Sequence, residues 1–210
     1  MKMLVAGFEP FGKFKNNPSQ ALVQELKQQG LCESLLLKTE YRSSVSKLLK
    51  IMEQIHPDIL LMTGLAAGIP KLHLERFAVN LNDCTLKDNA GEKRLNRPIQ
   101  SQSPLAYPST LPLKPILSEL KKQSIPAAIS NSAGTFICNH IFYSILSHLQ
   151  QKSSPRYTGF IHMPCSPQQI CKENLTLPSM STDLIVRAVK IIQDVCEQDS
   201  KKNRSASVSP

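Results

Sequence analysis

This 210-residue sequence lacks the short motifs that mark many nucleotide-binding and zinc proteins. It contains no GxGxxG pattern and no P-loop, so the usual phosphate-binding loops are missing. Its six cysteines include no CxxC pair, and the spacing between His162 and Cys165 does not match a structural zinc site. We therefore expect free thiols and no bound metal.

Long apolar segments are also missing. No uninterrupted apolar stretch is long enough to cross a bilayer. The apolar run at residues 3–8 meets Glu9 and Pro10 at once, which makes it too short for the core of a signal peptide. We expect a cytoplasmic protein that does not interact with membranes.

Aromatic and acidic residues are scarce. The chain has no Trp, seven Phe and four Tyr, and 25 basic residues outnumber 16 acidic ones, which gives a net charge of +9. Such a surplus favours acidic partners such as nucleic acid. Because the basic residues are scattered and few aromatic side chains are available to stack on bases, we expect no nucleic-acid partner. A basic protein that binds nucleic acid or an acidic surface stays as an alternative.

The amount of apolar sequence predicts one domain. Hydrophobic residues make up 41% of the chain, enough for one substantial core but short for two independent domains. We assign residues 1–196 to this domain. Residues 197–210 are polar and rich in Ser and Lys, and we expect them to form a disordered tail.

Apolar runs alternate with helical patterns along the domain. The first part predicts strands at 3–8, 35–37 and 58–64, with helices at 18–30 and 45–55 between them. The middle predicts two short extended pieces within 77–86 and a surface loop over 96–112. The last part predicts a helix at 114–123, a strand at 127–130, a helix at 137–149, a strand at 159–163 and a helix at 182–196. This alternation is typical of an α/β sandwich with parallel strands.

Three predicted loops carry reactive side chains. In an open parallel sheet, ligands bind at the carboxyl ends of the strands. The loop after strand 58–64 leads to Glu75, the loop after strand 127–130 leads to Cys138, and strand 159–163 carries His162. Cys138 lies where a loop enters a helix, and the positive end of a helix dipole favours a thiolate. A cysteine, a base and a carboxylate on three loops make a nucleophilic arrangement geometrically possible.

Each of these residues also has an interpretation without catalysis. Cys138 can be a buried, inert thiol that begins the apolar stripe of its helix. His162 can be a structural histidine, and Glu75 can form a surface ion pair with Arg76. Spacing alone does not select Glu75 among the acids. The weaker candidates are His73, His140, His148, Asp58, Asp83 and Asp88.

Four blocks of sequence occur in a specific order and spacing. They are GFEPFG at 7–12 with NPS at 17–19, LERFAVN at 74–80 with DN at 88–89, SAGTFICN at 132–139, and GFIHMP at 159–164 with PSMS at 178–181. Together they resemble pyroglutamyl peptidase I, the pyrrolidone-carboxyl peptidase family of cysteine peptidases. The resemblance runs over about residues 3–195.

The resemblance implies a set of roles and a fold. The family's nucleophile falls on Cys138, its general base on His162 and its orienting carboxylate on Glu75. It implies a three-layer α/β/α sandwich around an open, twisted, mostly parallel sheet, with no cofactor and no metal. It also implies a homotetramer, as is common for bacterial members, and a substrate with an N-terminal pyroglutamyl (5-oxoproline) residue.

A pyroglutamyl residue is a neutral lactam, so an apolar slot with a few backbone partners suits it. We expect this slot to be lined by side chains on the loops around the nucleophile. These residues are Phe8, Phe11, Phe136 and Ile137. The alternative is that they are ordinary core side chains.

The sequence departs from the family pattern in two places. It has Leu65-Ala66-Ala67-Gly68 where many bacterial members have Gln-Ala-Gly-Gly, and Thr85-Leu86-Lys87 where they often have Arg-Ile-Pro. These departures remove polar groups. They leave open a catalytically weak or silent family member that binds N-terminally blocked peptides without hydrolysing them.

Overall fold

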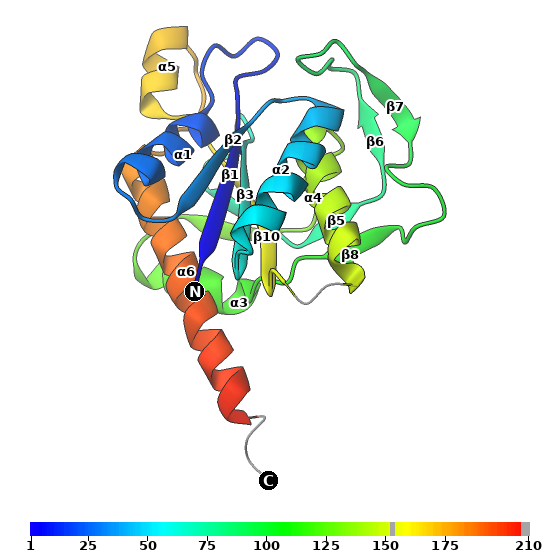
Figure 1. Cartoon of the computed structure of the whole chain (residues 1–210). Helices are drawn as coiled ribbons and strands as arrows, with labels where there is room; N and C mark the ends of the chain where they lie inside the picture. Colours follow the sequence, from blue (N-terminus) through cyan, green and yellow to red (C-terminus); the bar gives the residue numbers. More distant parts are fainter. Residues whose placement is uncertain (152–153, 207–210) are drawn as a thin grey trace.

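The computed structural model describes residues 1–151 and 154–206, and a six-stranded sheet lies at its centre (Figure 1). The strand order is β2-β1-β3-β10-β4-β9. The strands are β1 (Met3–Phe8), β2 (Glu33–Leu37), β3 (Ile59–Leu65), β4 (Leu72–Glu75), β9 (Ala127–Ser130) and β10 (Tyr157–Met163). Strands β2, β1, β3 and β10 are parallel to one another, while β4 pairs antiparallel with β10 and parallel with β9. The predicted mostly parallel sheet is therefore confirmed.

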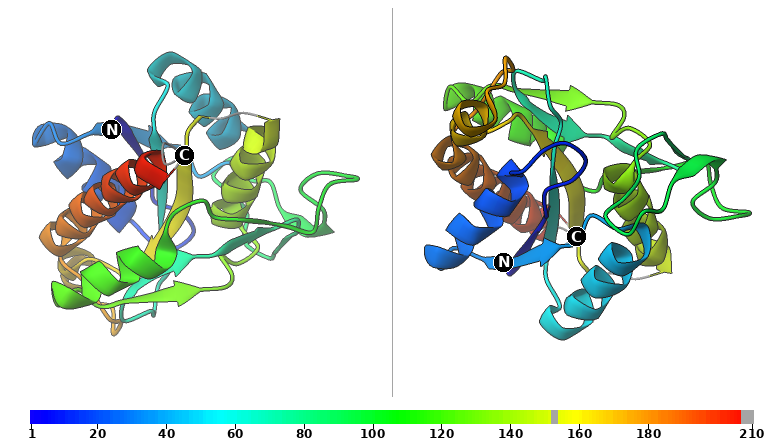
Figure 2. Two further views of the ribbon diagram at one scale, coloured as in Figure 1. Left: turned by 90° about the horizontal axis from the view of Figure 1, so that it is seen from below. Right: turned by 90° about the horizontal axis from the view of Figure 1, so that it is seen from above.

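Helices cover both faces of the sheet. Figure 2 shows α1, α3 and α6 (blue, green and orange to red) on one side and α2 and α4 (cyan and yellow-green) on the other. The helices are α1 (Pro18–Gln28), α2 (Tyr41–Ile55), α3 (Leu113–Lys122), α4 (Ile137–His148), α5 (Pro167–Glu173) and α6 (Thr182–Ala206), with a 3₁₀ turn η1 (Leu149–Gln151) after α4. The expected α/β/α arrangement is confirmed.

Alternation along the strands divides the core into two layers. In β3, Ile59 and Leu61 belong to the cluster under α1, α3 and α6, whereas Leu60 and Met62 belong to the cluster under α2 and α4. Successive side chains of a strand point to opposite faces, so a strand covered on both sides is apolar at nearly every position. This explains why the apolar runs of β1 and β3 were readable from the sequence.

Two small sheets lie outside the central one. Strand β5 (Phe77–Val79) pairs with β8 (Ala106–Pro108), and β6 (Asn82–Cys84) pairs with β7 (Arg94–Arg97). The two extended pieces expected within 77–86 are thus β5 and β6. The region expected to be a surface loop instead contains β8 and the end of β7.

Strand β4 corrects one premise of the sequence analysis. Because β4 pairs antiparallel with β10, and β9 pairs parallel with β4, β9 points toward the amino end of β10. The loop after Ser130 therefore does not leave the sheet at the same edge as the carboxyl ends of β3 and β10. Residues 131–136 carry the chain back to that edge, where α4 begins (Figure 1).

Helix α6 corrects the expected tail. It continues to Ala206, ten residues past the expected end at Cys196, and projects beyond the rest of the fold in Figure 1. The extension is held where Tyr157 Oη donates a hydrogen bond of 2.7 Å to Asp199 Oδ2. The expectation of a disordered tail over 197–210 is therefore wrong up to residue 206, and the last four residues lie outside the described part.

Within the described residues, none of the helices has the length and hydropathy of a membrane span.

Candidate active site

Strand register brings Glu75 and His162 to the same face of the sheet. Phe160 pairs with Glu75 and His162 pairs with His73 across the antiparallel β4–β10 ladder. Directly opposed residues share a face, as do residues two apart in one strand, so Glu75 and His162 are diagonal neighbours. Their side chains meet: Nδ1 of His162 donates a hydrogen bond of 2.8 Å to Oε1 of Glu75.

This pair is almost completely buried. Glu75 is 1% exposed and His162 is 6% exposed, and the His162 ring packs on the Phe160 ring with centroids 4.7 Å apart. Because a carboxylate accepts only, the proton of the bond lies on Nδ1, and Nε2 is the ring nitrogen that Glu75 does not engage. Glu75 therefore pairs with His162 inside the protein, and not with Arg76 at the surface.

Cys138 approaches the same place from the first turn of α4. It is the second residue of this helix, and the preceding Phe136 makes no capping hydrogen bond through its side chain. The chain enters the helix through Gly134, whose φ of +76° suits glycine. The first N–H groups of α4 and the positive end of its dipole therefore lie at Cys138. The Cys138 side chain is half-buried and reduced.

The Cys138 sulfur lies beside the His162 imidazole. Gly64 pairs with His162 across the parallel β3–β10 ladder, and a Cβ atom on Gly64 would lie 2.9 Å from Sγ of Cys138. Burial by itself lowers the pKa of His162. The negative charge of the Cys138 thiolate and hydrogen bonds with Cys138 and Glu75 outweigh burial and raise the pKa to about 9. The three residues thus form one connected chain, from a buried carboxylate to a sulfur at the half-buried end.

The four residues predicted to line a substrate slot fall into two groups. Phe8 and Ile137 are 2% and 1% exposed and lie in the core layer under α2 and α4. Phe11 and Phe136 are half-buried, with ring centroids 5.8 Å apart. Only Phe11 and Phe136 therefore present an appreciable surface near the start of α4.

Asn139, next to Cys138, was not singled out from the sequence. Its Oδ1 accepts a hydrogen bond from the backbone N–H of Val79 at 2.8 Å, and its Nδ2 donates to the carbonyls of Val79 and Leu81 at 2.9 and 3.0 Å. Asn139 is fully buried. It ties the first turn of α4 to the end of β5 and to Leu81 just after it, and so holds Cys138 in place. A polar residue inside the apolar start of a helix was the available signal.

Asp88 also gains a role that spacing did not reveal. Its carboxylate accepts hydrogen bonds from the backbone N–H groups of Tyr41, Ala90 and Glu92 at 3.0, 3.0 and 2.7 Å. The bond to Tyr41 caps α2, whose own N-cap residue makes no such bond. The next residue, Asn89, donates from Nδ2 to the carbonyl of Pro10 at 3.0 Å and so anchors the loop that carries Phe11.

The other histidines do not take the place of His162. His140 is 6% exposed, its Nδ1 is 3.1 Å from Oδ1 of Asn82, and its ring meets Tyr41 edge-on with centroids 5.1 Å apart. Burial, followed by the nearby Arg94 charge, lowers the pKa of His140 to about 4. It is therefore a neutral, structural histidine near neutral pH. His73 is half-buried beside Glu75, and burial lowers its pKa as well.

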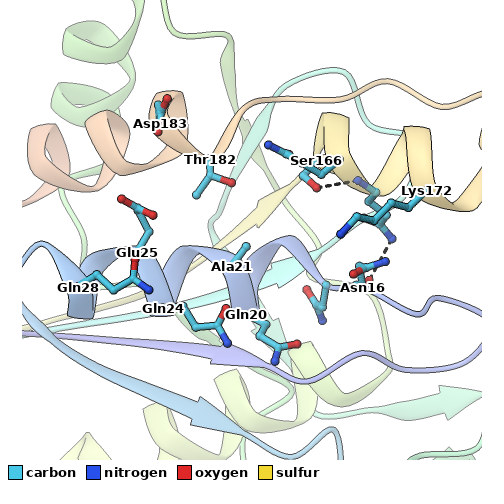
Figure 3. A pocket seen from close by; sticks show the side chains of 13 residues that line it. Asn16, Gln20, Ala21, Gln24, Glu25, Gln28, Ser166, Lys172, Thr182 and Asp183 are labelled. Atoms are coloured by element: carbon cyan, nitrogen blue, oxygen red, sulfur yellow. Dashed lines mark hydrogen bonds between the residues drawn. The ribbon is translucent and has the colours of Figure 1, made fainter.

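A polar groove of about 460 Å³ lies apart from these residues, on the other side of the sheet (Figure 3). It runs between α1, α5 and the start of α6. Side chains that line it include Asn16, Gln20, Gln24, Gln28, Ser166, Lys172, Thr182 and Asp183. Cys138, His162 and Glu75 do not line this groove, so it offers nothing to their chemistry.

The described residues hold no candidate metal centre. Across 1–151 and 154–206, no group of three or more His, Cys, Asp or Glu side chains is arranged to bind a metal ion.

Comparison with known proteins gives one family. The pyroglutamyl peptidase family matches residues 1–199. A pyrrolidone-carboxylate peptidase of Fusobacterium nucleatum is 41% identical over 207 residues, which cover 96% of each chain. Another, of Brachyspira hyodysenteriae, is 43% identical over 195 residues, 91% of this chain and 96% of the other. A mutant pyrrolidone carboxyl peptidase of the hyperthermophile Pyrococcus furiosus has a similar structure, with a TM-score of 0.89, 39% identity and coverage of 95% and 99%.

Proposed function

Since the chain belongs to the pyroglutamyl peptidase family of cysteine peptidases, we propose that it hydrolyses the amide bond after an N-terminal pyroglutamyl residue. In this proposal Cys138 is the nucleophile, His162 is the general base and Glu75 is the carboxylate that orients His162. The observation that carries this proposal is the chain of contacts from Glu75 through His162 to Cys138. The three side chains come from β4, β10 and α4, so only the folded protein unites them.

The first half-reaction forms a thioester. With the proton held on His162, the Cys138 thiolate attacks the pyroglutamyl carbonyl, a C–S bond forms and the carbonyl oxygen becomes an oxyanion. The imidazolium then donates its proton to the amide nitrogen as the C–N bond breaks, and the shortened peptide leaves with a free amine. The buried Glu75 carboxylate stabilises the imidazolium and keeps its Nδ1 protonated.

The second half-reaction regenerates the enzyme. The now neutral His162 accepts a proton from water while the hydroxide attacks the thioester. The C–S bond breaks, pyroglutamic acid leaves and the Cys138 thiolate is restored beside the imidazolium. The same pair of side chains thus serves as base and acid in turn.

The start of α4 supplies a place for the oxyanion. Because no side chain of the preceding residue caps this helix, the backbone N–H of Cys138 is free to donate to the developing negative charge. One such donor contributes about 3 kcal/mol in comparable sites. The positive end of the helix dipole acts in the same direction.

Substrate selection would depend on an apolar contact for the lactam ring. Phe11 and Phe136 are the better placed of the four residues that we assign to this slot, because both are half-buried and their rings are in contact. Phe8 and Ile137 would contribute from beneath, as the packed floor of the slot. We propose this division because a side chain that is almost completely buried can support a pocket without contacting much of the ligand.

The alternative is a silent member that binds blocked peptides. Its motivation was the loss of polar groups at Leu65 and Thr85. Leu65 is 5% exposed and, by strand alternation, points to the face opposite Gly64 and Cys138, and Thr85 is exposed. Neither departure removes an atom from the Glu75–His162–Cys138 chain, which favours an active enzyme.

Three further points are also proposals. We propose that residues 1–196 act as one catalytic domain, because the two core layers share one sheet. The cytoplasmic location is carried over from the sequence prediction, and the homotetramer is what the family resemblance implies. Size-exclusion chromatography with light scattering tests the tetramer, and a monomer at working concentration contradicts it.

A chromogenic pyroglutamyl amide tests the proposal. Wild type should release the chromophore, Cys138→Ala should not, and the matched control Cys171→Ala, which alters an exposed cysteine on α5, should retain full activity. Turnover that survives Cys138→Ala rules out this nucleophile. A wild type that binds a pyroglutamyl peptide without cleaving it supports the silent alternative instead.

A further inference from the structure

Gly64 occupies a regular strand where glycine is not required by the backbone. It lies in β3 between buried neighbours, and its φ is not positive, in contrast to Gly12 or Gly134. Glycine weakens a strand interior because it adds flexibility and contributes no packing. The backbone conformation does not explain a glycine at residue 64. Glycine in a strand often marks a point where another group approaches closely.

The group that approaches Gly64 is the sulfur of Cys138. A Cβ atom on Gly64 would lie 2.9 Å from Sγ of Cys138, and 3.0 and 3.2 Å from Cζ and Cε1 of Phe160. Gly64 pairs with His162 in the neighbouring strand, so both residues lie in the same row of the sheet. The space that a side chain at residue 64 would fill is the space that holds the sulfur next to the imidazole.

We propose that Gly64 is a positioning residue for the nucleophile, and that the absence of a side chain at this point lets the Cys138 sulfur lie against the sheet within reach of His162. The inference rests on the proposed function, since it assigns Gly64 a task in the same reaction. It adds a positioning residue to the reaction, on a strand that contributes no polar side chain to the site.

A single methyl group at residue 64 should displace the Cys138 sulfur and press on the Phe160 ring. Ordinary contact between heavy atoms lies at about 3.5–4.0 Å, so the 2.9 Å approach to Sγ has to open by about 1 Å. Phe160 cannot yield easily, because its ring is held between Phe142 and His162 at centroid distances of 5.9 and 4.7 Å. The sulfur can move by rotation about one bond, which takes it away from the imidazole.

The test compares Gly64→Ala with the matched control Thr63→Ser. Thr63 is the adjacent buried residue of β3, it points to the opposite face, and serine retains its hydroxyl, which bonds the carbonyl of Ala6. Four quantities are measured: kcat and KM for a pyroglutamyl amide, the rate at which iodoacetamide alkylates Cys138 near neutral pH, the titration of the His162 ring by NMR, and the thermal midpoint.

The expected result separates position from stability. In Gly64→Ala, kcat falls about 100-fold, as a displacement of about 1 Å can produce. KM changes little, alkylation of Cys138 slows, and the His162 titration moves back toward the ordinary histidine range. The thermal midpoint falls as well, because the methyl also meets Phe160. Thr63→Ser changes the midpoint at most, and leaves the other three quantities as in wild type.

Two results would overturn the inference. One is a Gly64→Ala enzyme with unchanged kcat, alkylation rate and His162 titration. The other is a loss of kcat that follows the thermal midpoint while alkylation and the His162 titration stay as in wild type, which would make Gly64 a purely structural residue. If wild type itself fails to cleave the amide, the proposed function fails, but alkylation and the His162 titration still decide the position of the sulfur.

Discussion

Replacing Glu75 with Gln removes the charge behind His162 while it keeps the size of the side chain. Oε1 of Glu75 accepts a hydrogen bond of 2.8 Å from Nδ1–H of His162, and Glu75 is 1% exposed, so water cannot compensate for the lost charge. Glutamine retains an acceptor oxygen, but it also carries an NH₂ group that can turn toward Nδ1. The imidazolium beside the Cys138 thiolate would then lose its buried counter-charge.

The magnitude follows from the bond that changes. A hydrogen bond to a charged group contributes about 1.5–3 kcal/mol, against about 1 kcal/mol for a neutral pair. The difference of about 0.5–2 kcal/mol lowers the pKa of His162 by roughly one unit. The NH₂ group can also force the wrong tautomer of His162. The comparable replacement in a serine-protease triad lowers kcat by about 10⁴-fold for this reason. We therefore expect kcat to fall by about 10²-fold to 10⁴-fold with little change in KM.

The assay is hydrolysis of a chromogenic pyroglutamyl amide over a range of pH, combined with NMR titration of His162. Glu33→Gln is the matched control, because Glu33 is an exposed carboxylate at the start of β2. It should behave as wild type. A Glu75→Gln enzyme with a kcat and a His162 titration equal to those of wild type would refute the role assigned to Glu75.

Three other substitutions test the supporting structure. Asn139→Ala removes three hydrogen bonds to backbone groups, so it should lower the free energy of unfolding by about 3 kcal/mol and reduce kcat. Urea titration measures the first effect, and an unchanged free energy of unfolding contradicts the prediction. The pKa of His140 falls from 6.5 to about 4 on folding, so its stability contribution is full above 6.5 and is lost as the pH falls through 4. His140→Gln should remove about 3 kcal/mol of this acid sensitivity, and an acid dependence equal to that of wild type contradicts it. Asp88→Asn should lower the free energy of unfolding by about 1–2 kcal/mol, because it weakens the cap of α2. It should also raise KM, because the neighbouring Asn89 anchors the loop that carries Phe11. An unchanged free energy of unfolding and an unchanged KM contradict this prediction.

Apolar runs and helical stripes made most of the central fold readable. Strands β1, β3 and β10 are buried on both faces, and β1 and β3 stand out as nearly continuous apolar sequence. Strand β4 does not, because its four residues, Leu72–Glu75, alternate apolar and polar and include the half-buried His73. Its direction depends on pairing with β10, which lies more than eighty residues further along the chain, and a local pattern carries no information on such pairing.

The site followed from the sequence only in part. Residue types and spacing suggested a cysteine, a histidine and an acid, but the choice of Glu75 depended on family resemblance. The reason Glu75 is correctly placed to meet His162 is strand register, which no local pattern reveals. The sequence left open whether Phe8 and Ile137 line the slot or belong to the core, and it missed the extension of α6 to Ala206, since each depends on distant packing partners.

The most direct test of the account is to trap the thioester. Wild type is mixed with an activated pyroglutamyl ester, quenched with acid within the first turnover and digested for mass spectrometry. The account predicts a pyroglutamyl group on the peptide that contains Cys138, and none in Cys138→Ala. Turnover with no acyl group on any cysteine, or with the group on another thiol such as Cys84, would contradict it.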